Sequence, residues 1–219
     1  MITIPESFFI KNETTTFADT KLALDEPNGL IGIGGELSTN RLIEAYKKGI
    51  FPWYSEGEPI LWYSPNPRMI VDKTSLKISK SLAKILKSNK FEIRIDKDFA
   101  SVIKHCKGIN RKEQSGTWID DKMLNYYVEL HKLGFAKSVE VYENNVLVGG
   151  LYGVCLGKVF FGESMFSLKS NTSKIAFTHL VKNMDYQLID CQVENPHLKS
   201  LGAFTIKRSL FNAYLQKLL

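Results

Sequence analysis

The residues best suited to chemistry are a carboxylate among aromatic side chains and a carboxylate–amide pair. Glu163 lies in residues 160–167 (FFGESMFS), where Phe and Met surround it. Asp190 and Gln192 lie two positions apart on an apolar, strand-like segment, so both should project from one face. A carboxylate in such surroundings either gains hydrogen-bond donors or has a raised pKa, and both are common at active sites. The residues alone leave two roles open for these acids. They could be catalytic, or they could be buried acids whose hydrogen bonds come from the backbone or from Lys174.

Other candidates for chemistry are weaker. The glycines of residues 32–35 (GIGG) could hold a phosphate, but no strand and helix frame them, so a plain turn is the preferred interpretation. Ser164 lacks the G-x-S-x-G pattern of a nucleophile elbow. His179 lies in an apolar helical pattern, which favours a packed histidine. The three Cys and four His have neither zinc-site nor disulfide-framework spacing, so no metal site is predicted.

Three tryptophans lie in segments marked by Pro or Gly: Trp53, Trp62 and Trp118. Tryptophan is most often a core residue, but its ring also stacks on nucleic-acid bases. Core packing and base stacking therefore both stay open for these residues.

The positive charge of the chain is concentrated in one block. The 219 residues include 29 Lys+Arg and 23 Asp+Glu, a net charge of +6. Residues 73–112 alone carry 12 basic and 3 acidic side chains, a net charge of +9. Part of this excess would line one face of a helix over 80–88, at Lys77, Lys80, Lys84 and Lys87. The density of charge favours contact with phosphates over a merely solvated face.

The composition indicates an ordinary globular protein, with 44% hydrophobic and 24% charged residues. The N-terminal residues lack the basic and apolar regions of a secretory signal. The longest uncharged apolar stretch, residues 146–157, is too short to span a bilayer. We therefore expect a cytoplasmic protein with no membrane partner.

The elements that must position these residues form an α+β pattern. Caps and apolar periodicity predict helices over 39–48, 80–88, 98–106, 121–133, 171–184 and 208–218. Alternation predicts strands over 91–95, 137–143, 146–152, 159–163 and 188–192, with a hairpin at Asn144-Asn145. We predict a small N-terminal domain over 1–70 with the Gly-rich and Trp-containing loops. A second domain over 71–219 would include the basic region 73–112 and the candidate catalytic residues.

Several motifs occur together along nearly the whole chain. They are EPNGL (26–30), IGGELS (33–38), Ala45-Tyr46, GIFPW (49–53), ILWYSP (60–65), Pro67-Arg68, GTWI (116–119), VGGLYG (148–153), FGESMFS (161–167), LIDCQ (188–192), and His197-Leu198 with SLGA (200–203). In this order they resemble the leucyl/phenylalanyl-tRNA–protein transferase family, bacterial enzymes of the N-degron pathway. The motifs cover most of the sequence, so chance similarity is excluded.

The resemblance implies a reaction. Leu or Phe, and sometimes Met, would pass from aminoacyl-tRNA to the α-amine of proteins beginning with Arg or Lys, without ATP, metal or other cofactor. The catalytic domain would resemble the GNAT acyltransferase fold, with a mixed central sheet, in a protein that works as a monomer. Asp190 and Gln192 would be catalytic. In one account Asp190 polarises Gln192, and in the other both residues act only by positioning the substrate. Glu163 would hold the cationic acceptor terminus.

The resemblance also implies binding sites. An apolar pocket for the Leu or Phe side chain would include Leu151, Phe177, Leu180 and Ile189, although ordinary core packing is the simpler interpretation. Trp53 and Trp118 would contact the terminal adenosine of the tRNA. The lysine face would meet acceptor-stem phosphates with little reading of bases.

Two other functions fit parts of the pattern. The first is a GNAT-like N-acyltransferase that uses CoA, but residues 168–174 replace the Gly-rich pyrophosphate loop of such enzymes. The second is a non-catalytic tRNA-binding module, against which the intact Glu163, Asp190 and Gln192 argue. The sequence departs from the family at Lys137, where His is usual, and in a shortened link between Lys174 and Asp190.

Overall fold

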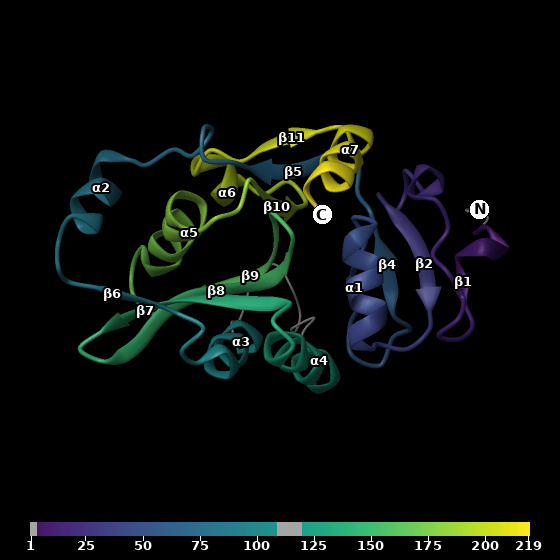
Figure 1. Cartoon of the computed structure of the whole chain (residues 1–219), viewed down its shortest axis with the longest axis horizontal. Helices are drawn as coiled ribbons and strands as arrows, with labels where there is room; N and C mark the ends of the chain where they lie inside the picture. The colour runs from purple at the N-terminus through teal and green to yellow at the C-terminus, as the bar shows by residue number, and fades with distance from the viewer. Residues whose placement is uncertain (1–3, 109–119) are drawn as a thin grey trace.

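The chain forms two β-sheets, a small one near the N-terminus and a larger one built mainly from later residues (Figure 1). The computed structural model describes residues 4–108 and 120–219. The small sheet has the strand order β1-β2-β4-β3, with β1 parallel to β2 and the other pairs antiparallel. Its strands are β1 (Phe9–Ile10), β2 (Leu30–Gly34), β3 (Phe51–Pro52) and β4 (Leu61–Tyr63).

The large sheet has the strand order β11-β5-β10-β9-β8-β7-β6. Among its described strands β9 and β10 pair in parallel, whereas the other neighbours are antiparallel. Its strands are β5 (Arg68–Val71), β6 (Glu92–Ile95), β7 (Ala136–Glu143), β8 (Val146–Leu156), β9 (Val159–Ser167), β10 (Leu188–Gln192) and β11 (Phe204–Ile206). The sheet is therefore mixed, as the resemblance implies.

Helices cover both faces of the large sheet (Figure 1). On one face lie α5 (Thr172–Asn183) and, beside it, α2 (Lys80–Leu86); on the other lie α3 (Phe99–Lys107) and α4 (Asp121–Lys132). The remaining α-helices are α1 (Thr39–Lys47), α6 (Pro196–Ser200) and α7 (Arg208–Leu218), and the 3-10 turns are η1 (Glu6–Phe8) and η2 (Thr20–Leu22). Helix α1 packs against β3 of the small sheet and against α4, so the two sheets form one continuous body.

The predicted helices, strands and hairpin are confirmed, with ends shifted by a few residues. The caps act as expected: Ser38 Oγ accepts from the N–H of Arg41 at 3.1 Å and begins α1. Asn144 and Asn145 have φ of 51° and 62°, the left-handed pair that a tight hairpin turn needs. The predicted α+β class, with a small N-terminal unit, is therefore correct.

One interpretation of the N-terminal part is wrong, and for Trp62 one of the two open alternatives is confirmed. The glycine-rich segment is strand β2 rather than a plain turn, and it pairs with β4. A Cβ on Gly32 would lie 3.2 Å from the Trp62 side chain, so glycine allows this close packing. Trp62 is fully buried, and its indole Nε1 donates to the carbonyl of Gly34 at 3.1 Å. Trp62 is thus a core residue and is not available to stack on a base.

One apolar core joins the N-terminal unit to the large sheet. It contains Leu42 and Tyr46 from α1 together with Tyr127 from α4 and Phe161 from β9. The predicted domain boundary at 70/71 falls within β5, which belongs to the large sheet. Within the described ranges, no helix combines the length and apolarity needed to cross a membrane.

Candidate active site

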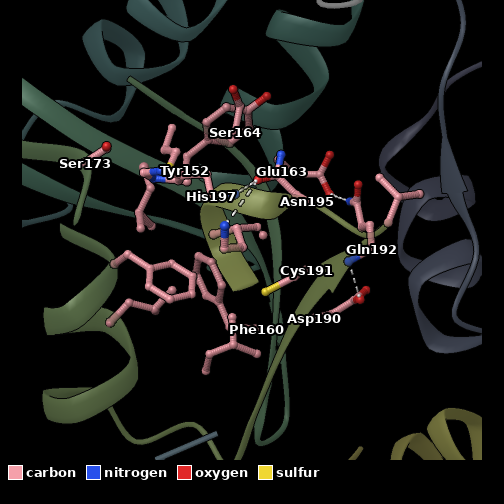
Figure 2. Close-up of a pocket in the computed structure, with 18 of the residues that line it drawn as sticks. Tyr152, Phe160, Glu163, Ser164, Ser173, Asp190, Cys191, Gln192, Asn195 and His197 are labelled. Atoms are coloured by element: carbon pink, nitrogen blue, oxygen red, sulfur yellow. Dashed lines mark hydrogen bonds between the residues drawn. The ribbon is translucent and has the colours of Figure 1, made fainter. Parts of the chain in front are cut away.

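A cavity opens where β9 and β10 separate. The two strands pair in parallel only from Leu188–Val159 to Asp190–Phe161, and β9 then continues to Ser167 without β10 beside it. A cavity of about 540 Å³ occupies this gap. Figure 2 shows the lining side chains gathered around the end of β10.

The cavity reaches both faces of the large sheet. Its apolar wall, which includes Leu151, Phe177, Leu180 and Ile189, belongs to the core on the α5 side. Phe51 and Phe166 line it as well and belong to the other core, which packs against α1, α3 and α4. The cavity therefore borders the cores on both faces of the sheet.

Five of the six residues predicted to bind substrate line this cavity. They are the four apolar residues Leu151, Phe177, Leu180 and Ile189 and, at the edge, Trp53, whose side chain is 39% exposed. The sixth, Trp118, lies outside the described residues. The three predicted catalytic residues Glu163, Asp190 and Gln192 also line the cavity.

Glu163 is nearly buried, with 9% of its surface exposed, and three donors hold its carboxylate. Tyr46 donates to Oε1 at 2.7 Å, Tyr127 donates to Oε2 at 3.0 Å, and Gln192 Nε2 donates to Oε1 at 3.0 Å. Burial raises the pKa of Glu163 to about 7, although the two tyrosine hydrogen bonds lower it in part. A carboxyl group that changes its charge near neutral pH therefore faces the cavity.

Tyr46 and Tyr127 were not among the residues predicted for the site. Their hydroxyl oxygens lie 2.5 Å apart, and burial raises the pKa of both well above the usual value for tyrosine. Both therefore stay neutral and act as donors to Glu163. In the sequence each is simply an apolar position on an amphipathic helix, and 81 residues separate them. Only the packing of α1 against α4 brings them together.

Asp190 is fully buried and makes a two-pronged ion pair with Arg68. Arg68 Nε donates to Oδ1 at 2.8 Å and Nη2 donates to Oδ2 at 2.6 Å. The Oδ1 atom also accepts from the backbone N–H of Gln192 at 2.9 Å. Asp190 therefore reaches Gln192 through the main chain, not through the side-chain amide as the polarisation account requires.

Gln192 connects Asp190 to Glu163, and lies between them in Figure 2. Its φ of 63° is in the left-handed region, and the pairing of β10 with β5 shifts register between Asp190 and Gln192. This bulge replaces the regular two-residue alternation that the sequence suggests. Even so, the Gln192 amide turns to the carboxylate of Glu163.

The predicted tRNA-binding lysines lie away from this network. Lys77, Lys80, Lys84 and Lys87 are all exposed, on α2 and its flanks. α2 packs against α5, the helix that supplies Phe177 and Leu180 to the cavity. The basic face and the cavity are thus connected through one helix pair. Within the described residues no group of three potential metal ligands occurs.

Two family models match this chain, one for each of two consecutive segments. The family model described as leucyl/phenylalanyl-tRNA protein transferase matches residues 70–216, and the model for the N-terminal domain of that family matches residues 35–66. The chain belongs to the leucyl/phenylalanyl-tRNA–protein transferase family. Membership confirms the predicted family and the predicted enzyme class, an aminoacyltransferase.

Relatives within the transferase family match along most of their length. The leucyl/phenylalanyl-tRNA–protein transferase of Nitrosospira multiformis is 52% identical over 92% of this chain and 88% of its own. The one from Hydrogenovibrio crunogenus is 46% identical over 98% of this chain and 85% of its own. Among solved structures, a GCN5-related N-acetyltransferase from Kribbella flavida aligns with a TM-score of 0.39 and 8% identity, over 74% of this chain and 59% of that one.

In this transferase, the turn before α5 is bonded to strands β8 and β9. The Thr172 hydroxyl bonds to the carbonyls of Val148 and Lys169, and the N–H of Ser173 donates to Ser167 Oγ at 2.9 Å. A helix N-terminus binds phosphate through open N–H groups. The N–H groups of Thr172 and Ser173 at the start of α5 already have hydrogen-bond partners, so neither is open to a phosphate.

Proposed function

We propose that the protein transfers Leu or Phe, and sometimes Met, from aminoacyl-tRNA to the α-amine of proteins beginning with Arg or Lys, which marks them for degradation. The observation that supports this most is the place of Glu163. Its carboxyl group lies where an apolar pocket passes between two strands of the sheet. The cytoplasmic location and the monomeric state stay predictions.

The apolar part of the cavity suits the transferred residue. Leu and Phe share a large apolar volume and an unbranched Cβ, so one deep pocket can accept both. Leu151, Phe177, Leu180 and Ile189 are each less than 5% exposed and present only hydrocarbon surface. Burial of apolar area there would provide affinity without selecting one exact shape. The partly exposed ring of Trp53 would take the terminal adenosine by stacking.

Glu163 suits the acceptor amine on electrostatic grounds. A protein α-amine has a pKa of about 7.7–8.0, and burial raises the pKa of Glu163 to about 7. Proton transfer from the ammonium to this carboxylate is therefore nearly balanced, as efficient general base catalysis requires. The carboxylate would also hold the cationic terminus before it reacts.

The reaction can then be written with its protons. Glu163 takes one proton from the acceptor ammonium, and the neutral amine attacks the carbonyl carbon of the aminoacyl ester. The C–N bond forms, the amine loses its second proton to solvent, and the C–O bond to the ribose breaks. Glu163 returns its proton to the leaving ribose oxygen. The products are an amide, a tRNA with a free hydroxyl and one released proton.

Gln192 would orient the reacting groups. Its Nε2 donates to Glu163, so its carbonyl oxygen turns the other way and can accept from the incoming amine. The carboxylate of Asp190 is engaged by Arg68 and by the backbone of Gln192. We therefore assign Asp190 to positioning, and Glu163 and Gln192 to contact with the substrate.

Removal of the basic face should weaken tRNA binding in a salt-dependent way. Replacing Lys80, Lys84 and Lys87 together by Ala should make the dependence of the dissociation constant on salt less steep. The slope of log Kd against log[salt] should fall by about two to three, since each phosphate contact contributes about 0.7–0.9. The measurement is the dissociation constant of Leu-tRNA at several salt concentrations. The control variant removes three exposed lysines elsewhere, at Lys47, Lys132 and Lys217. Equal slopes for the two variants would refute the basic-face assignment.

Transfer of labelled Leu tests the proposed function. The protein is incubated with labelled Leu-tRNA and peptides that begin with Arg, with Lys or with Nα-acetylated Arg. Label should enter the first two peptides only, because the acetylated amine is not a nucleophile. No label in any peptide would contradict the function. Label from acetyl-CoA instead would support the CoA-dependent alternative, and tRNA binding without transfer would support the binding module.

A further inference from the structure

We propose that Arg68 is a positioning residue for the transfer reaction: through Asp190 it holds the backbone of Gln192, so that the Gln192 amide meets Glu163. The inference rests on the proposed function, because its readout is the transfer of Leu. Arg68 itself touches no substrate in this account. It acts indirectly, through contacts that run from Arg68 to Asp190, then to Gln192 and finally to Glu163.

The contacts around Arg68 hold it in one orientation. Its side chain is fully buried, and its guanidinium lies between two rings, 4.9 Å from the centre of Phe51 and 4.7 Å from that of Phe211. Two of its nitrogens form the fork to Asp190 at 2.8 and 2.6 Å. A planar guanidinium between two rings cannot rotate without losing both the fork and the stacking. Arg68 therefore defines where the carboxylate of Asp190 lies.

Asp190 transmits this position to Gln192. The oxygen that accepts from Arg68 Nε is the same one that accepts from the N–H of Gln192, at 2.9 Å. Gln192 has a φ of 63°, a conformation that a residue with a side chain adopts only when its surroundings hold it. The bond from Asp190 is one such support. Its loss would let the backbone of Gln192 relax toward an ordinary strand.

The strand pairing explains why the residue that holds Asp190 lies on β5. β10 pairs with β5 at Asp190–Ile70 and at Gln192–Met69, and the register shift lies between these two pairs. Arg68 is the first residue of β5, directly next to this irregularity. Its side chain packs on Phe51 and Phe211, which belong to the same core as Tyr46 and Tyr127, the two tyrosines that bond to Glu163. Arg68 is thus placed to fix the bulge that turns the Gln192 amide toward Glu163.

Lysine would not replace Arg68 in this role. It keeps the positive charge but has a single nitrogen, so it cannot hold both carboxylate oxygens in one plane or stack between two rings. Asp190 would keep an opposite charge beside it while losing its fixed orientation. Arg68→Lys is therefore a more specific variant than removal of the charge.

The test compares two buried arginines. Arg41 is 4% exposed, pairs with Glu44 at 2.8 Å and lies 5.2 Å from the Phe17 ring, but it does not line the cavity. Arg68→Lys and Arg41→Lys are assayed for the rate of Leu transfer from saturating Leu-tRNA, per folded molecule. We expect Arg68→Lys to lower this rate by about 10²-fold, since a displacement of about 1 Å at a reacting group has that effect. Arg41→Lys should keep the wild-type rate, and the affinity for Leu-tRNA should be unchanged in both.

A double-mutant cycle separates positioning from general stability. If Arg68 acts through Gln192, then Gln192→Ala removes the same effect, and Arg68→Lys combined with Gln192→Ala should be no slower than Gln192→Ala alone. Equal rates for Arg68→Lys and Arg41→Lys, or additive losses in the cycle, would overturn the proposal. Absence of transfer by the wild-type chain would instead contradict the proposed function, and the inference with it.

Discussion

Replacement of Glu163 by Gln should lower the rate of Leu transfer from bound Leu-tRNA by about 10²–10⁴-fold, the usual contribution of a general base. The amide has the size of the carboxyl group and can still accept from Tyr46 and Gln192, while its nitrogen donates to the Tyr127 hydroxyl. It cannot take a proton from the acceptor amine. The fold and the affinity for tRNA should therefore stay intact while transfer is lost.

A second buried carboxylate provides the matched control for this variant. Glu140 is fully buried and accepts from Ser138 Oγ at 2.8 Å, from the Tyr142 hydroxyl at 2.9 Å and from the N–H of Asp98 at 2.8 Å. It does not belong to the lining of the cavity. Glu140→Gln should therefore keep the wild-type rate in a single-turnover assay. If Glu163→Gln transfers Leu as fast as Glu140→Gln, then Glu163 does not act as the general base.

Replacement of Asp190 by Ala should destabilise the whole fold by about 3–5 kcal/mol, because it leaves the fully buried Arg68 as an unpaired cation. The sequence suggests a simpler result, a slower reaction in an otherwise normal protein. The ion pair changes that expectation, since Asp190 has a structural partner that the motif does not reveal. The free energy of unfolding, measured by urea denaturation at one pH, checks the value.

A double variant separates two effects of Asp190→Ala: the loss of the ion-pair partner of Arg68 and the loss of side-chain packing at position 190. Arg68→Met combined with Asp190→Leu replaces both charges by apolar side chains, and such replacements of buried ion pairs are often neutral or stabilising. We expect it to recover most of the free energy of unfolding that Asp190→Ala loses, but not the transfer rate. A loss below about 1 kcal/mol in Asp190→Ala would contradict a buried, unpaired Arg68.

The elements that local patterns control could be predicted from the sequence. Caps such as Ser38 and the two asparagines of the hairpin act within a few residues of themselves, so their effect is visible in the sequence. Glu163 was found because a carboxylate in an apolar strand is unusual, whereas the pocket residues Leu151, Phe177, Leu180 and Ile189 came from the family resemblance. Their place around one cavity follows from the sheet topology that these strands adopt.

The partners of the site residues could not be predicted in this way. Arg68 and Asp190 are 122 residues apart and meet only because β5 and β10 pair in the large sheet. β5 is only four residues long, and no strand is predicted there from the sequence. Tyr46 looks like any apolar helix position until α4 brings Tyr127 against it. Such long-range pairings decide which atoms face the carboxylates.

The measurement that tests the central claim most directly is the pH dependence of single-turnover Leu transfer. A carboxylate with a pKa of about 7 that acts on an ammonium of pKa about 7.7–8.0 gives a rate that rises through pH 7. The rate should then fall above pH 8, because Glu163 and the amine together no longer hold the proton that the leaving ribose oxygen receives. Glu163→Gln should lack this maximum and rise steadily until the amine is neutral. A wild-type rate that rises steadily, as in Glu163→Gln, would contradict proton transfer to Glu163.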